Sequence, residues 1–177
     1  MLYGALGFGL GGLVYGVAIS IPSPATGYFL ALSGFVVQAA PGGIALGLAM
    51  KKNWRETIML GVFSTIGFLI GKYILILPFA LLIGDRFSGN PPESYFVGLL
   101  VGGLTGAGAG AAIALGSYGK VAVKSLAIAG GLGFGIGMLV TTPLYYGLTP
   151  QHWLGHMLTG LIGGTTLGAA IGKLKGS

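Results

Sequence analysis

The sequence predicts an all-α integral membrane protein of six transmembrane helices, built as three tandem two-helix hairpins in a pseudo-threefold arrangement. Three observations predict this class: few charged residues, repeated apolar runs of membrane-spanning length, and a motif that returns along the chain. The 177 residues have a mean hydropathy of +0.90 and only 7% are charged, against about 25% in soluble domains. We therefore expect one membrane domain, residues 1–177, whose surroundings are a lipid bilayer.

Six apolar runs, bounded by charged residues or by Pro, Gly and Asn, account for nearly the whole chain. About 20 apolar residues cross a hydrocarbon core of about 30 Å, so each run is predicted to be one span. No basic residue precedes the first run, which continues to Pro22. This favours a spanning helix over the alternative, a removed signal peptide. The predicted helices cover residues 2–21, 28–50, 57–83, 95–117, 121–142 and 152–173.

The basic residues predict which side of the membrane the loops face. Lys and Arg are enriched in cytoplasmic loops. The loops after the first, third and fifth runs hold Arg86 alone, whereas seven of the nine basic residues follow the second, fourth and sixth runs. Both termini and the basic loops are therefore predicted to be cytoplasmic. The residues on that side are Lys51, Lys52, Arg55, Lys120, Lys124, Lys173 and Lys175.

A Gly-Phe motif repeats in the odd-numbered runs with a period of about 60 residues, which predicts repeat units of about 1–55, 56–120 and 121–177. Each unit contains two spans, so successive units enter the membrane in the same direction and form parallel repeats. The alternative is a chance match between glycine-rich apolar segments. The motifs occupy residues 7–11, 67–71 and 133–137, and each precedes a proline: Pro22, Pro78 and Pro143.

Glycine is abundant inside the predicted helices, with 37 glycines in the chain. Small residues on one helix face allow close backbone approach, on which helix association in lipid depends. These positions predict either packing within the chain or contact with other protomers or membrane subunits. The candidate packing positions are Gly67, Gly71, Gly98, Gly102, Gly106, Gly110, Gly133 and Gly137.

Lys72 is the most informative residue, because an ionisable side chain inside an apolar span is costly and usually faces a bundle interior or an aqueous cavity. It lies about 24 Å along the third helix from Glu56. Ser64 and Thr65 precede it on roughly the same face and extend a polar stripe toward the cytoplasmic end. We expect Lys72 to attract an anionic or carbonyl-bearing solute. The alternative is that the span ends at Pro78 and Lys72 reaches the outer surface.

Gln38 and Pro41 form a second candidate site in the second run. Pro41 has no N–H, so the carbonyl of Val37 loses its normal helical donor. We expect a broken helix here, of the kind that is tolerated at membrane depth where it lines a cavity. Gln38 and the Val37 carbonyl would then contact a solute. The alternative is that Gln38 satisfies the local defect itself.

Catalysis and cofactor binding are not expected. The chain has no cysteine, which removes thiolate ligands and cysteine nucleophiles. His152 and His156 share one helix face and are weak candidates for metal binding, or are interfacial anchors. The few acids and histidines are too dispersed for a catalytic triad. The net charge of +6 fits anionic lipid head groups, and no nucleic-acid role is predicted.

The function expected from these residues is a small-solute membrane transporter or channel. The features that favour it are the repeat, the predicted helix break and the intramembrane lysine. The alternative is a structural or assembly subunit, or a binding component, of a larger membrane complex. In that case the glycine-rich faces would be docking surfaces for another subunit or a second copy.

Overall fold

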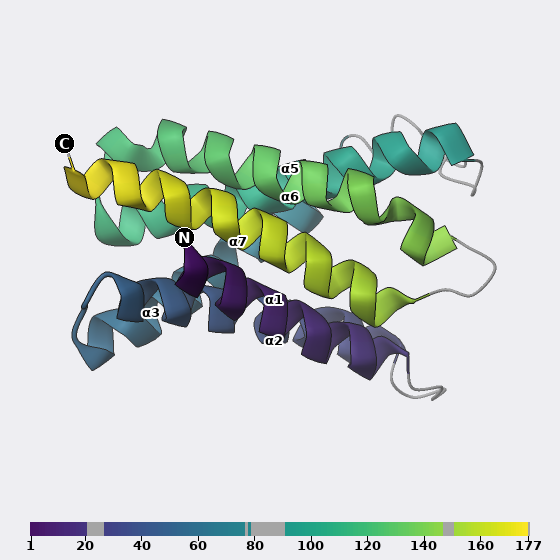
Figure 1. The fold of residues 1–177 in the computed structure, drawn as a ribbon, viewed down its shortest axis with the longest axis horizontal. Coiled ribbons are helices and arrows are strands. Elements are labelled where there is room, and N and C mark those ends of the chain that lie inside the picture. The colour runs from purple at the N-terminus through teal and green to yellow at the C-terminus, as the bar shows by residue number, and fades with distance from the viewer. Residues whose placement is uncertain (21–26, 77, 79–90, 147–150, 177) are drawn as a thin grey trace.

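A computed structural model describes residues 1–177 except 21–26, 77, 79–90, 147–150 and 177. Every element in this described part is helical (Figure 1). A π-helical turn, η1, directly continues α3, and a short 3₁₀ turn, η3, leads into α6. The elements are α1 (Leu2–Ile19), α2 (Gly27–Ala49), α3 (Trp54–Leu69), η1 (Ile70–Leu75), α5 (Pro91–Ser117), η3 (Lys120–Ala122), α6 (Val123–Tyr146) and α7 (His152–Gly176).

The helices have the length and composition of membrane spans. Within the described residues, five helical segments are long and apolar enough to cross a bilayer. The other long helix, α2, has 23 residues, and its segment from Val36 to Ala49 is also apolar. Large apolar side chains point outward along the helices, Val140 being 62% exposed. These features indicate a multi-pass integral membrane protein.

Several helices differ from the sequence prediction in their boundaries or regularity. The third helix begins at Trp54 rather than 57, because the Asn53 side chain caps it by accepting a hydrogen bond from the Glu56 backbone N–H at 2.9 Å. The fifth predicted helix continues through Pro143 to Tyr146. The third run is not one regular helix, because its α-helix changes to a π-helical turn at Ile70.

The prediction of a broken second helix is wrong. α2 runs as one α-helix from Gly27 to Ala49 with Pro41 inside it. A proline removes one donor from a helix, but neighbouring helices can support the rest of the ladder within a membrane bundle. The irregular backbone occurs instead at η1, around Lys72.

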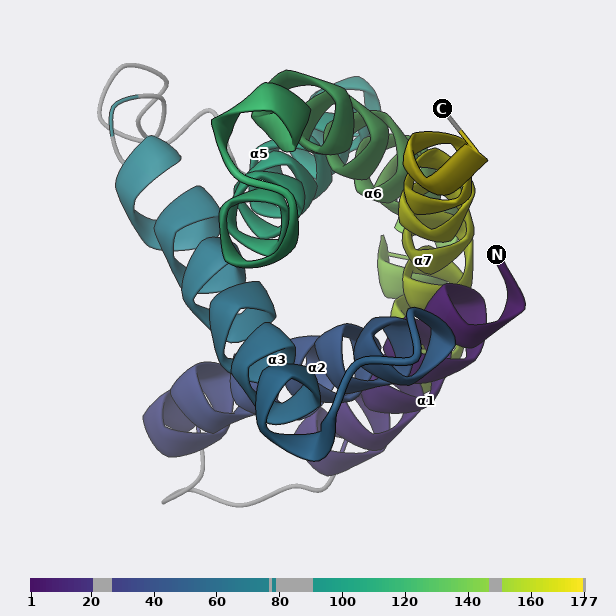
Figure 2. The same cartoon turned by 90° about the vertical axis from the view of Figure 1, so that its left-hand side faces the viewer.

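The long helices form a closed ring in the order α1, α2, α3, α5, α6 and α7, with α7 packed against α1 (Figure 2). We call this arrangement the helix ring. One end, the lysine end, carries Lys52 and Lys120 at the short connections, and both termini lie toward it (Figure 1). The opposite end, where α7 begins at His152, is the histidine end.

Neighbouring helices approach closely at glycines. A Cβ added to Gly164 of α7 would meet the carbonyl oxygen of Gly4 on α1, and one added to Gly4 would meet the Gly164 carbonyl. Gly106 of α5 and Gly130 of α6 are related in the same reciprocal way. In each of these contacts, backbone atoms of one helix lie against backbone atoms of the other. A side chain at any of the four positions would therefore force two helices apart.

The eight glycines predicted as packing positions all face a neighbouring helix. That these residues drive association in the membrane stays a prediction, although small residues are known to permit such approach. An added Cβ would meet α5 at Gly67 and Gly71, α6 at Gly98, Gly102, Gly106 and Gly110, and α7 at Gly133 and Gly137.

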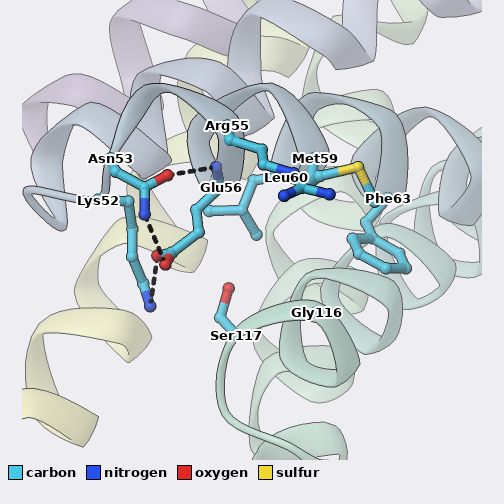
Figure 3. Close-up of a pocket in the computed structure, with 9 residues that line it drawn as sticks. All are labelled: Lys52, Asn53, Arg55, Glu56, Met59, Leu60, Phe63, Gly116 and Ser117. Carbon is cyan, nitrogen blue, oxygen red and sulfur yellow. Dashed lines mark hydrogen bonds and ion pairs between the residues drawn. The ribbon is translucent and has the colours of Figure 1, made fainter.

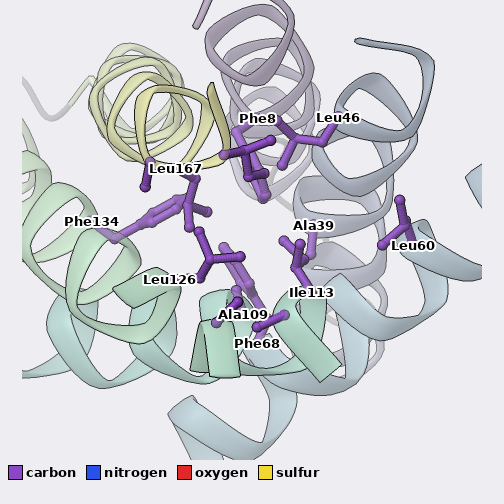
Figure 4. Packing of buried hydrophobic residues seen from close by; sticks show 14 of the residues in the cluster. Phe8, Ala39, Leu46, Leu60, Phe68, Ala109, Ile113, Leu126, Phe134 and Leu167 are labelled. Atoms are coloured by element: carbon purple, nitrogen blue, oxygen red, sulfur yellow. The ribbon is translucent and has the colours of Figure 1, made fainter. Parts of the chain in front are cut away.

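The centre of the ring contains three fully buried phenylalanines, which we call the phenylalanine cluster (Figure 4). Phe8 and Phe68 stack with their ring centroids 5.9 Å apart. Phe134 meets both rings edge-on, at 5.2 Å from Phe8 and 5.1 Å from Phe68. Aromatic pairs in these geometries add about 0.5–1.5 kcal/mol each beyond their buried area. The three rings belong to the Gly-Phe segments at residues 7–11, 67–71 and 133–137.

Candidate functional site

A small cavity lies inside the helix ring, beside the phenylalanine cluster and toward the histidine end. The volume of this cavity is about 70 Å³. We call it the central cavity. Its walls come from every long helix except α1, and they are Gln38, Phe68, Lys72, Val101, Gly102, Thr105, Phe134, Met138, His156 and Thr159.

The π-helical turn η1 positions Lys72 in the cavity wall. Lys72 lies one helical turn beyond Phe68, within the six-residue π segment. π-Helical turns are rare and occur frequently at functional sites. Gly71 allows this segment to contact α5, where an added Cβ would meet the Leu104 carbonyl. The Lys72 ammonium lies 5.8 Å from the centre of the Tyr73 ring.

His156 is held between two tyrosines on the opposite wall. Its ring centroid is 4.6 Å from that of Tyr15 and 5.0 Å from that of Tyr145, both in edge-on geometry. Tyr15 belongs to α1 and Tyr145 to α6, so the imidazole is positioned by the helices on either side of α7. Lys72 and His156 therefore line the central cavity from η1 and α7.

The two histidines do not gather further metal ligands in the described part of the chain. There, no three side chains of His, Cys, Asp or Glu lie close enough to hold a metal ion. His152 instead lies against the Tyr145 ring, with centroids 5.9 Å apart. Aromatic contacts therefore account for both imidazole positions.

Threonines supply hydroxyl groups to the cavity. The Thr159 hydroxyl hydrogen-bonds the Thr141 hydroxyl at 2.9 Å and so joins α7 to α6. Thr105 differs, because its buried hydroxyl has no hydrogen-bond partner within the protein, and the residue is only 6% exposed. A buried polar group without a partner costs about 1–3 kcal/mol. Thr105 is therefore the hydroxyl with most to gain from a ligand in the cavity.

Two of the five residues predicted to bind solute lie together in the central cavity. Lys72 enters from η1 and Gln38 from α2. Gln38 is 5% exposed, although it lies in the middle of an apolar helix. Its amide is thus directed toward the ring interior rather than toward lipid.

The other three predicted residues lie outside this cavity. Ser64 is buried one turn from Phe68 on the lysine-end side, and its hydroxyl has no hydrogen-bond partner. Thr65 donates to the Gly61 carbonyl at 2.9 Å and lines a groove between α2 and α3. Val37 is 37% exposed and lines an outer groove between α1 and α2. One step along a helix turns a side chain by about 100°, so residues next to an inward-facing position face elsewhere.

Sequence reasoning missed the contributions of Thr105, Met138, His156 and Thr159 to one site. A signal was present for Met138, which follows Phe134 by one helical turn as Lys72 follows Phe68. His156 carried no such signal, because its inward direction depends on how α7 rotates against α1. The threonines resembled helical hydroxyls that bond their own backbone, as Thr165 does with the Leu161 carbonyl.

A second, larger pocket of about 570 Å³ opens at the lysine end between the start of α3 and the end of α5 (Figure 3). Lys52 and Glu56 form an ion pair there at 3.1 Å, and Asn53 donates to the same carboxylate at 2.8 Å. Exposed pairs of this kind contribute little to stability, about 0–1 kcal/mol. Arg55 also lines the pocket, which makes this mouth of the ring polar.

No protein-family model matches the chain, and no curated protein or solved structure is significantly similar to it. The functional argument therefore depends on the cavity and its residues.

Proposed function

We propose that the chain is a transporter or channel for small solutes that are anionic or carry a carbonyl group. The observation that carries this proposal is the convergence of Lys72, Gln38, Thr105 and His156 on one cavity inside a ring of apolar helices. Ionisable residues inside a membrane are expensive and characteristically mark solute or ion pathways. A purely structural bundle has no need for this group of side chains at its centre.

The chemistry of the cavity favours electron-rich solutes. Lys72 provides ammonium donors, Gln38 an amide donor and Thr105 a hydroxyl donor. Binding sites with a few convergent polar groups in apolar walls are typical of small-molecule recognition. Here Phe68, Phe134 and Met138 supply the apolar walls.

The path in this conformation is closed toward the lysine end. Fully buried aliphatic side chains fill the ring between the phenylalanine cluster and that end (Figure 4). Solute passage then requires the helices to separate there, so a gated path is favoured over a permanently open pore. The filling residues are Leu46, Ile113, Leu126 and Leu167.

The three predicted hairpins would surround this path with pseudo-threefold symmetry. Phe8, Phe68 and Phe134 occupy the same place in the three motifs and meet at the ring centre, as three parallel repeats around one axis require. The reciprocal contact of Gly4 with Gly164 also resembles that of Gly130 with Gly106. These agreements support a pseudo-threefold arrangement, with packing glycines at the seams.

The proposed orientation places the lysine end in the cytoplasm. Basic residues are enriched in cytoplasmic loops, and most of those in this chain lie at the lysine end. They include Lys51, Lys52, Lys120, Lys124 and Lys173. The central cavity would then be nearer the external side.

Flux into proteoliposomes tests the proposal. Purified protein is reconstituted and supplied with a panel of small anions, cations and neutral carbonyl compounds. We expect uptake by the wild type and loss of uptake in Lys72→Met, while Lys124→Met, which removes an exposed lysine at the lysine end, transports normally. Unchanged uptake in Lys72→Met would remove that residue from the mechanism.

A second candidate function follows from the closed half of the ring. A cavity with one blocked side also suits a binding component, or a structural subunit, of a larger membrane complex whose partner opens the path. Vesicles that stay impermeable to the whole panel, together with stoichiometric co-purification of another membrane protein in mild detergent, would favour this alternative. A homo-oligomer or monomer that transports on its own would exclude it.

A further inference from the structure

We infer that the central cavity is a binding site for a small monovalent anion, held by Lys72 and His156 together with the hydroxyl of Thr105. The inference rests on the proposed function. It narrows the proposed substrates from anionic or carbonyl-bearing solutes to small anions alone. It also assigns to His156 and Thr105 a role in binding.

The lysine in the cavity wall favours an anion. Lys72 and His156 both line the cavity, and its described walls contain no Asp or Glu. A cation in the cavity would therefore meet a like charge in this wall. An anion would instead receive charge-assisted hydrogen bonds, which are roughly twice as strong as neutral ones.

Thr105 independently points to a ligand. Its hydroxyl is buried and unpartnered within the protein, although helical threonines can bond a backbone carbonyl of their own helix. Thr141 and Thr142 do so, because each hydroxyl donates a hydrogen bond to a backbone carbonyl one helical turn earlier. Because the Thr105 hydroxyl lines the cavity, an anion there would give it the acceptor that it lacks.

The volume limits the size of the anion. One water position needs about 10–15 Å³ of this kind of space, so about 70 Å³ holds roughly five such positions. Halides, nitrate and formate fit this limit, whereas a glycerophosphate head group does not. A single negative charge matches the single lysine in the wall.

Calorimetric titration of the purified protein in detergent tests this site without requiring transport. The probes are formate and its neutral counterpart formamide, which have nearly the same size. The variants are Thr105→Val, which removes one hydroxyl, and Thr65→Val as the matched control, because the Thr65 hydroxyl already bonds its own helix. Lys72→Met tests the charge, and circular dichroism establishes that each variant is folded.

We expect formate to bind and formamide not to bind. Losing one charge-assisted hydrogen bond in Thr105→Val should raise the Kd about tenfold or more, while Thr65→Val keeps the wild-type Kd. Lys72→Met should weaken binding at least about thirtyfold. Equal binding of formamide and formate, an unchanged Kd in Thr105→Val, or no formate binding at all would overturn the inference.

The same data separate this inference from the proposed function. Formate binding without flux into vesicles would support the anion site and contradict transport by the chain alone. Lysine-dependent flux of neutral solutes without anion binding would support transport and contradict the anion site.

Discussion

Gly164 and Gly172 lie on the same helix, α7, and differ in their surroundings. A Cβ added to Gly164 would meet the carbonyl of Gly4 on α1, whereas one added to Gly172 would meet no atom within 4 Å. Replacement by alanine gains a similar helix propensity at both sites, about 1 kcal/mol in water. The difference in stability between the two alanine variants therefore isolates the packing of α7 against α1.

The size of this difference follows from what blocks the new methyl group. Overpacking costs about 1–3 kcal/mol, and the upper end is expected because the Gly4 backbone cannot rotate away as a side chain can. A cost of about 3 kcal/mol lowers the Tm by about 6–12 °C in a chain of this length. Gly164→Ala should therefore melt that far below Gly172→Ala.

Thermal unfolding in detergent, followed by circular dichroism, measures this difference. Both variants contain one added methyl group on the same helix, so effects of composition and detergent cancel. Equal melting temperatures would show that α1 and α7 do not meet at Gly4 and Gly164. The helix ring would then not close as described.

Three further predictions concern the closed end of the ring, a helix cap and a hydroxyl contact between α6 and α7. Leu126→Ala should raise solute leak through proteoliposomes, because it removes one of the side chains that fill the ring toward the lysine end, while Phe63→Ala, which lies outside that filling, should not; equal leak in the two variants would contradict a closed path. Asn53→Ala removes the side-chain cap of α3 and should cost about 1 kcal/mol, measured as a lower Tm; an unchanged Tm would contradict the cap. Thr141→Val breaks the hydroxyl bond to Thr159 and should also cost about 1 kcal/mol; a stability equal to wild type in the same melt would count against that contact.

The membrane class and most helix positions were predictable from the sequence, because apolar length and the near absence of charge have few other physical explanations. Lys72 and Gln38 were also identifiable as candidates, since polar side chains in an apolar run must find an interior surface. The structure brings both to the central cavity. Their actual role as ligands for a solute stays a prediction.

The remaining parts of the site depend on tertiary packing. The rule that proline breaks a helix suggested an irregular backbone at Pro41, but the regular helix continues there and the π turn occurs at Lys72. His156 faces inward because the glycine contacts between α1 and α7 bring its ring between Tyr15 and Tyr145. Neither the π turn nor this rotation of α7 follows from local residue preferences.

The proposed function requires that solutes in water reach the central cavity inside the helix ring. The chain has no cysteine of its own, so single cysteines can be placed at Met138, which lines the cavity, and at Val140, which faces outward on the same helix. The direct measurement is the rate at which iodoacetate, a small anion, alkylates each thiol in reconstituted vesicles. We predict rapid alkylation of Met138→Cys, slowed by formate, and little reaction of Val140→Cys within lipid. Equally slow reaction at both positions would contradict a water-accessible cavity and the transport function built on it.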